Sequence, residues 1–186
     1  EWVEHVLRNL RSGGRGVGLE RWSCIPSPAI SSVLESALVA AGHELCDVSL
    51  GMRRIRRIKS AEEIAVIRRA QAACDAGIAG MLRELRPEMS GLEAWARYSL
   101  AMVRAGGEPA ALHETVAGGA SVAAIHALSG RTPLGEGPVV YPYMAAAVHG
   151  YHARATRPVT FGAPPAELVR LTEQAAGVVG VLRELA

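Results

Sequence analysis

Residues 137–157 read Gly-Pro-Val-Val-Tyr-Pro-Tyr-Met-Ala-Ala-Ala-Val-His-Gly-Tyr-His-Ala-Arg-Ala-Thr-Arg. Two runs within this segment, 138–143 and 148–152, are rich in valine and tyrosine, which predicts two strands. We place the turn between them at the small residues near 145–146. Because proline cannot donate to a strand ladder, we expect Pro142 at a sheet edge or a bulge.

Helical patterns lie on both sides of this β-rich segment. Residues 60–63 and 90–93 each place a serine three positions before a glutamate, the capping box that begins a helix. The first helix is expected to end at Pro87 and the second at Arg104, and two such consecutive helices form an antiparallel pair. A last helix is expected over 164–184, after a pair of prolines.

The N-terminal part has the pattern of a parallel crossover unit. A helical spacing over 3–10 is followed by a short apolar strand at 16–19, a helix beginning at Pro28 and a second strand at 44–48. Residues 52–59 then carry five positive charges in eight positions, which we interpret as a solvated basic linker.

Composition excludes several classes of function. The chain has 186 residues, of which 49% are hydrophobic, and 20 Lys and Arg against 18 Asp and Glu give a net charge of +2. This balance gives no electrostatic reason to bind nucleic acid or acidic membranes. No apolar run approaches the ~20 residues that span a bilayer, and no signal peptide is visible. The three cysteines form no pair motif, so we expect reduced thiols and a cytoplasmic protein.

Histidines are the main candidates for chemistry. His126 follows the glycine-rich segment 118–121 and lies in a loop, where an imidazole can act as a general acid or base or can simply hold the loop by hydrogen bonds. His149 and His152 are three apart, so in a strand they face opposite sides and are poor partners for one metal ion. No zinc motif, phosphate loop, dinucleotide fingerprint or nucleophile elbow is present.

Four stretches taken together resemble the creatinase, prolidase and aminopeptidase P superfamily, whose fold is called pita-bread. Their order and spacing carry the resemblance more than any one of them does. The stretches are Val17-Gly18-Leu19-Glu20, residues 54–70, Gly118-Gly119-Ala120-Ser121 with His126, and Gly137-Pro138-Val139-Val140 followed by residues 150–157.

The resemblance implies an α+β fold in two parts. Residues 60–186 would be the first half of a pita-bread catalytic domain, and residues 1–51 the end of an α/β N-terminal domain, joined by the basic linker 52–59. Family members are larger, so the second half of the catalytic domain is expected to be missing from this chain. A homodimer is also implied, because family members are commonly dimers.

Two positions depart from the metal-dependent members of the superfamily. Tyr143 and Arg154 stand where those members have their first two metal-binding aspartates. Arginine has no lone pair to offer and stays charged, so it opposes a divalent cation. We therefore expect no metal ion and no other cofactor. His126 matches the acid/base histidine of creatinase, whereas Thr156 stands where creatinase has a glutamate. Residues 151–157 are similar to a stretch of the ectoine hydrolase-like branch.

These features predict a metal-independent hydrolase that cleaves a C–N bond in a small amide, amidine or dipeptide-like compound. His126 would be catalytic, and Tyr143, His152, Arg154 and Arg157 would bind a small-molecule or peptide-like substrate. One alternative is an inactive pita-bread domain that only binds. A second alternative is a metallopeptidase, similar to Xaa-Pro dipeptidases, with a rearranged site.

Overall fold

The structure is a computed structural model and describes residues 2–10, 15–22, 26–111, 114–123, 127–137 and 139–184. The chain divides into two compact units, residues 1–60 and residues 61–186. Each unit has its own strands and helices, and each is described by itself below.

The first unit is built on a pair of parallel strands, as the strand, helix, strand pattern predicts. β1 (Gly16–Leu19) and β2 (Glu44–Asp47) pair in parallel along their whole length. They are connected through α2 (Pro28–Ala40), which has its proline in the first turn, where the missing N–H costs nothing. α1 (Trp2–Asn9) packs on α2.

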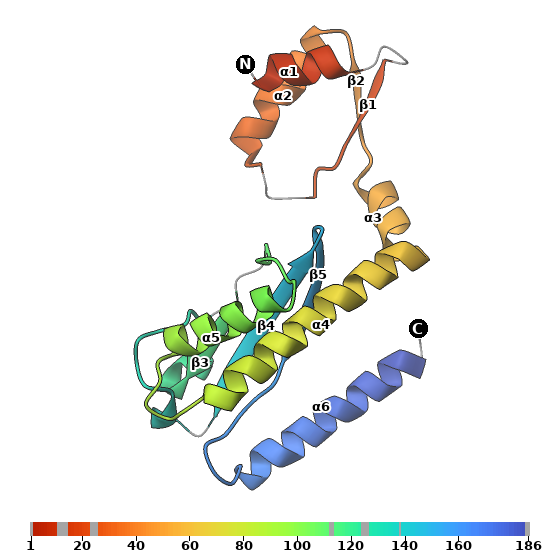
Figure 1. Cartoon of the computed structure of the whole chain (residues 1–186). Helices are drawn as coiled ribbons and strands as arrows, with labels where there is room; N and C mark the ends of the chain where they lie inside the picture. Colours follow the sequence, from red (N-terminus) through yellow and green to blue (C-terminus); the bar gives the residue numbers. More distant parts are fainter. Residues whose placement is uncertain are drawn as a thin grey trace. The chain divides into compact units, whose positions relative to one another are not determined.

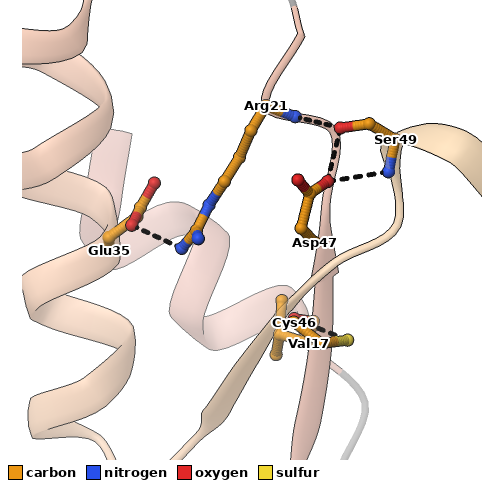
Figure 2. A network of polar contacts seen from close by, with 6 residues as sticks. All are labelled: Val17, Arg21, Glu35, Cys46, Asp47 and Ser49. Carbon is orange, nitrogen blue, oxygen red and sulfur yellow. Dashed lines mark hydrogen bonds and ion pairs between the residues drawn. The ribbon is translucent and has the colours of Figure 1, made fainter.

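The stretch 52–59, predicted as a linker, is largely helical and belongs to α3 (Ser49–Arg57). Hydrogen bonds hold the start of this helix in place (Figure 2). The Asp47 carboxylate accepts hydrogen bonds from the Ser49 hydroxyl and, at 2.9 Å, from the Ser49 N–H, and the Ser49 hydroxyl accepts one from the Arg21 N–H at 2.8 Å. These bonds from Ser49, the side-chain bond first, lower the pKa of Asp47 below its usual range. The chain leaving β1 is thereby tied to the start of α3.

The second unit is a helix pair packed on a three-stranded antiparallel sheet (Figure 1). The strands lie in the order β3 (Thr115–Gly118), β4 (Val140–Val148) and β5 (Tyr151–Thr156). α4 (Ala61–Glu84) and α5 (Gly91–Arg104) pack against each other and against the sheet, α4 on β4 and β5 and α5 on β3. The predicted pair of consecutive helices is present, with both helices on one face of the sheet.

The core of the second unit lies between these helices and the sheet. The capping box predicted at Ser90 and Glu93 is formed in full, with both reciprocal hydrogen bonds, and it begins α5. A Cβ added at Gly77 would lie 2.5 Å from the Tyr98 ring, so the lack of a side chain there lets α4 and α5 approach closely. The largest fully buried side chains of this core include Tyr98, Met81, Leu134, Met144, Val116, Val140 and Cys74.

The turn between the last two strands is not where the sequence pattern placed it. Residues 145–147 are three buried alanines inside β4, and the turn is formed by His149 and Gly150. Both turn residues have positive φ angles, 49° and 78°, as a two-residue hairpin turn requires. The prediction was wrong because small residues do not by themselves mark a turn, and here the three alanines let the strand pack closely.

Pro142 is also not at an edge, because it lies in β4, the middle strand. The ladder between β4 and β5 ends at the Tyr143–Thr156 pair and reappears as a single bridge between Val140 and Val159, in the same register. Pro142 lies in the gap, where its missing N–H removes a ladder bond. Among the described residues after Thr156, only Val159 pairs with β4.

Short 3-10 helices, η1 (Gly119–Ala123) and η2 (Leu134–Glu136), follow β3 and precede β4. The predicted last helix is present as α6 (Ala166–Glu184), and none of its residues is buried. No helix in the described ranges is long and apolar enough to cross a membrane.

Candidate functional site

The two faces of the sheet differ in chemistry because side chains alternate along each strand. Val140, Met144, Ala146 and Ala155 join the core beneath the helices. The opposite face is called the outer face below. Its polar members, alternating with the core residues, are Thr115, Tyr141, Tyr143, His152, Arg154 and Thr156, and Ala117, Ala145 and Ala147 lie on the same face.

Tyr143 and Arg154 lie together on the outer face. Tyr143 pairs with Thr156 and Arg154 with Ala145, so the two side chains are diagonal neighbours on adjacent strands. The Arg154 guanidinium lies over the Tyr143 ring, 5.0 Å from its centroid. Arg154 is exposed and Tyr143 is half-buried. The structure thus brings together two residues that are eleven positions apart in the sequence.

Arg157 is held on the other side of the sheet. One guanidinium nitrogen lies 4.0 Å from the Asp75 carboxylate, on α4, and the other donates to the Thr156 carbonyl at 3.1 Å. The structure therefore does not bring Arg157 to the outer face beside Arg154. Both partners of the ion pair are more than half exposed, so the pair orients the side chain more than it stabilises the fold.

His152 lies on the outer face opposite Ala147, and both its ring nitrogens contact backbone groups. Nε2 accepts a hydrogen bond from the Ala111 N–H at 2.9 Å, so Nε2 carries no proton. Nδ1 lies 2.9 Å from the Gly150 carbonyl and donates to it in that tautomer. This arrangement ties the segment before β3 to the hairpin.

Two of the residues singled out by the sequence need separate mention. His126, the predicted acid/base, lies outside the described residues, so its role stays a prediction. Tyr151 points to the helix side, where its hydroxyl donates to Glu63 on α4 at 2.9 Å. This hydrogen bond raises the pKa of Tyr151, which keeps the phenol neutral.

Sequence reasoning did not single out Thr115, the first residue of β3. Thr115 pairs with Tyr143 and is only 3% exposed, and its hydroxyl oxygen has no hydrogen-bond partner among the residues that the structure describes. A buried hydroxyl without a partner is unusual and marks a strained or functional position. Only the strand register could have revealed it, because Thr115 and Tyr143 are far apart in the sequence.

The outer face as described does not fit a metal ion. Metal sites in proteins need carboxylate, imidazole or thiolate donors, and Tyr143 and Arg154 supply a phenol and a permanent positive charge. Within the described ranges, no three His, Cys, Asp or Glu side chains come close enough together to hold a metal ion. The guanidinium, held over the ring, would repel a cation placed between the two strands.

Comparison with solved structures shows the fold. The chain is similar to a prolidase from Pyrococcus horikoshii OT3, with a TM-score of 0.74 and 23% identity over 93% of this chain and 48% of that one. It is also similar to an X-Pro aminopeptidase from Thermotoga maritima MSB8, with a TM-score of 0.71 and 21% identity over 91% and 47%. A prolidase from Pyrococcus furiosus gives a TM-score of 0.69 and 21% identity over 82% and 44%.

These likenesses confirm the predicted fold class, part of a pita-bread domain, and the chain spans about half the length of the structures it matches. No curated protein sequence matches the chain. The sequence profile of metallopeptidase family M24 matches residues 65–179, which is more than half of the chain and includes most of α4, all of α5 and the three-stranded sheet. The chain therefore belongs to metallopeptidase family M24.

Proposed function

We propose that this chain carries part of the active site of a hydrolase that cleaves a C–N bond in a small amide, amidine or dipeptide-like compound without a resident metal ion. The observation that supports this proposal is the Arg154 guanidinium stacked over the Tyr143 ring, at the two positions where the resemblance expects metal-binding aspartates. Membership of a peptidase family supports hydrolysis of a C–N bond as the reaction class.

The proposed reaction needs a proton carrier and a group that stabilises negative charge. Water adds to the carbonyl or amidine carbon, the C–N bond breaks, and a proton from the water reaches the leaving nitrogen. We assign that proton transfer to His126, because an imidazole both accepts and donates a proton near neutral pH. The Tyr143 phenol can donate a hydrogen bond to the oxygen on which negative charge develops.

The remaining two candidate ligands are engaged by other groups of the protein. Arg157 is held by Asp75 and by the Thr156 carbonyl, and His152 is held by two backbone groups. His152 therefore ties β5 to the segment before β3, whereas Arg157 is held on the helix side of the sheet, away from the outer face. The homodimer and the cytoplasmic location stay predictions.

The proposal is tested by metal analysis and turnover on the same preparations of the protein. Creatine-like, ectoine-like and proline-containing dipeptide compounds are the first substrates to screen, before and after dialysis against a chelator. We expect turnover that survives dialysis and falls by about 10²-fold or more in His126→Ala, the range of general acid–base catalysis. His149→Ala, in the exposed hairpin turn, is the matched control and should keep full turnover.

A second candidate function is a binding domain without catalysis. It is favoured by the contacts of His152, because both ring nitrogens of this residue are bonded to backbone groups and neither is available to transfer a proton to a substrate. If the protein turns over none of the screened compounds but binds one of them saturably, this alternative is selected. One or two tightly bound transition-metal ions per chain after dialysis would instead favour a metallopeptidase with a rearranged site.

A further inference from the structure

Arg154 lies against its neighbour Tyr143 and has no carboxylate partner among the described residues. Its guanidinium lies over the Tyr143 ring, and the side chain is exposed. Arg157, three residues further along the chain, pairs with the Asp75 carboxylate, whereas no ion pair involves Arg154 in the described part of the chain. A charge held in place without a counterion is suited to take one from a ligand.

Stacking determines which part of the guanidinium remains available. The Tyr143 ring lies on one side of the guanidinium carbon, and the N–H groups of an arginine spread along the edge of its own plane. This edge matches the two oxygens of a carboxylate, with two parallel hydrogen bonds. The ring also removes water from one face of the cation, which strengthens its attraction to an anion.

The immediate surroundings on the sheet offer no competing negative charge. The direct strand partner of Arg154 is Ala145, and those of Tyr143 are Thr156 and Thr115. All three are uncharged, and the Thr115 hydroxyl is buried against solvent. Arg154 is therefore the charged residue that an anion would contact at the Arg154–Tyr143 pair.

We propose that Arg154, stacked on Tyr143, is a carboxylate-binding subsite, so that the substrates are amides or amidines that carry a free carboxylate near the bond to be cleaved. This rests on the proposed function, because it gives the substrate class of the same site. A single guanidinium edge fits a monoanionic carboxylate, whereas phosphate sites are typically built from a helix N-terminus or a loop of backbone N–H groups.

Binding is tested without any need for turnover. The Arg side-chain N–H resonances of the 15N-labelled protein are followed by NMR while N-acetylglycine is added, and then its neutral amide, N-acetylglycinamide. We expect saturable shifts of the Arg154 resonance with the acid, affinity weaker by about tenfold or more for the amide, and a similar loss for the acid in Arg154→Gln. Arg154→Lys keeps the positive charge but loses the two parallel N–H donors of the guanidinium. It should bind the acid with part of the original affinity, and that binding shows that a chain substituted at this position folds.

Arg157→Gln is the matched control, since this arginine is three residues away and already paired with Asp75. It should bind the acid as the unchanged protein does. Any of three results would overturn the subsite. The unchanged protein could bind the acid and the amide with equal affinity, Arg154→Gln could bind the acid as tightly as the unchanged protein does, or only Arg157→Gln could lose affinity for the acid. Inorganic phosphate that displaces N-acetylglycine at equal affinity would also overturn it, as a general oxyanion site.

The two proposals fail in different ways. If the acid binds through Arg154 but no C–N bond of any compound is cleaved, the hydrolase proposal fails and the subsite stands. If turnover is found and Arg154→Gln leaves the KM of carboxylate-bearing and neutral substrates unchanged, the subsite fails and the hydrolase stands.

Discussion

Replacing Tyr98 by phenylalanine should destabilise the second unit through the loss of one hydroxyl group. Tyr98 is fully buried on α5, its hydroxyl donates to the Ala145 carbonyl at 2.7 Å, and the Cys74 sulfur lies 3.5 Å from the same oxygen. Phenylalanine keeps the ring and its packing, so the change removes a hydrogen bond across the core and little else. Leaving the buried Ala145 carbonyl without this donor costs about 1–3 kcal/mol, which is the expected decrease in the free energy of unfolding.

The same hydroxyl predicts how stability changes in alkali. Burial, and then the contact with Cys74, raise the pKa of Tyr98 far above its ordinary value of 10.0, so the folded protein keeps the proton that the unfolded chain releases. Stability from this group is complete below about pH 10 and declines as the pH rises above it. The difference between Tyr98→Phe and the unchanged protein should therefore narrow above pH 10. Burial also raises the pKa of Cys74 above its ordinary value of 9.0. The free energy of unfolding of both proteins should therefore begin to decline near pH 9.

Urea unfolding followed by tryptophan fluorescence measures both effects. Trp95 on α5 reports the second unit once Trp2 and Trp22, both in the first unit, are replaced by phenylalanine. Tyr141→Phe on the half-buried outer face is the control and should change the midpoint little. An equal loss in Tyr98→Phe and in this control would refute the buried hydrogen bond. A difference that stays constant to high pH would refute the raised pKa.

Four further substitutions test the fold at separate places. Thr115→Val removes the buried hydroxyl that has no partner and should raise the free energy of unfolding by about 1 kcal/mol in urea titrations. Gly77→Ala should lower it by about 1–3 kcal/mol, because the new Cβ would lie 2.5 Å from the Tyr98 ring. Gly177→Ala in α6, where nothing lies within 4 Å, should instead only add helix, as seen by circular dichroism. Asp47→Asn should remove the part of acid unfolding below about pH 3.8 that protonation of this carboxylate causes, since its pKa is lowered in the folded state.

Local signals in the sequence predicted the elements well where one short motif determines the geometry. The capping box at Ser90 and Glu93 begins α5 as expected, because both hydrogen bonds lie within one turn of chain. The parallel pairing of β1 with β2 followed from the length of the crossover between them. The hairpin was misplaced because three successive alanines hide the alternation of faces that sets strand register.

The site could be predicted only as a set of positions. Sequence reasoning named Tyr143, Arg154 and Arg157 together, but strand parity sends the third to α4, where Asp75 pairs with it. Such a separation depends on which face each residue takes, and the ladder determines this across long sequence distances. For the same reason the buried hydroxyl of Thr115 beside Tyr143 could not be seen from local pattern.

The exchange of two carboxylates for a tyrosine and an arginine makes physical sense only as a pair. Two aspartates on diagonal positions of adjacent strands repel each other unless a cation lies between them. Arg154 placed beside an aspartate at 143 would form an ion pair, which consumes the charge that a substrate could use. Tyr143 instead holds the guanidinium through its ring, worth about 0.5–1 kcal/mol at an exposed site, and leaves the N–H edge free. Tyr143→Asp should therefore abolish carboxylate binding even though Arg154 is still present, whereas Tyr143→Phe should keep most of it.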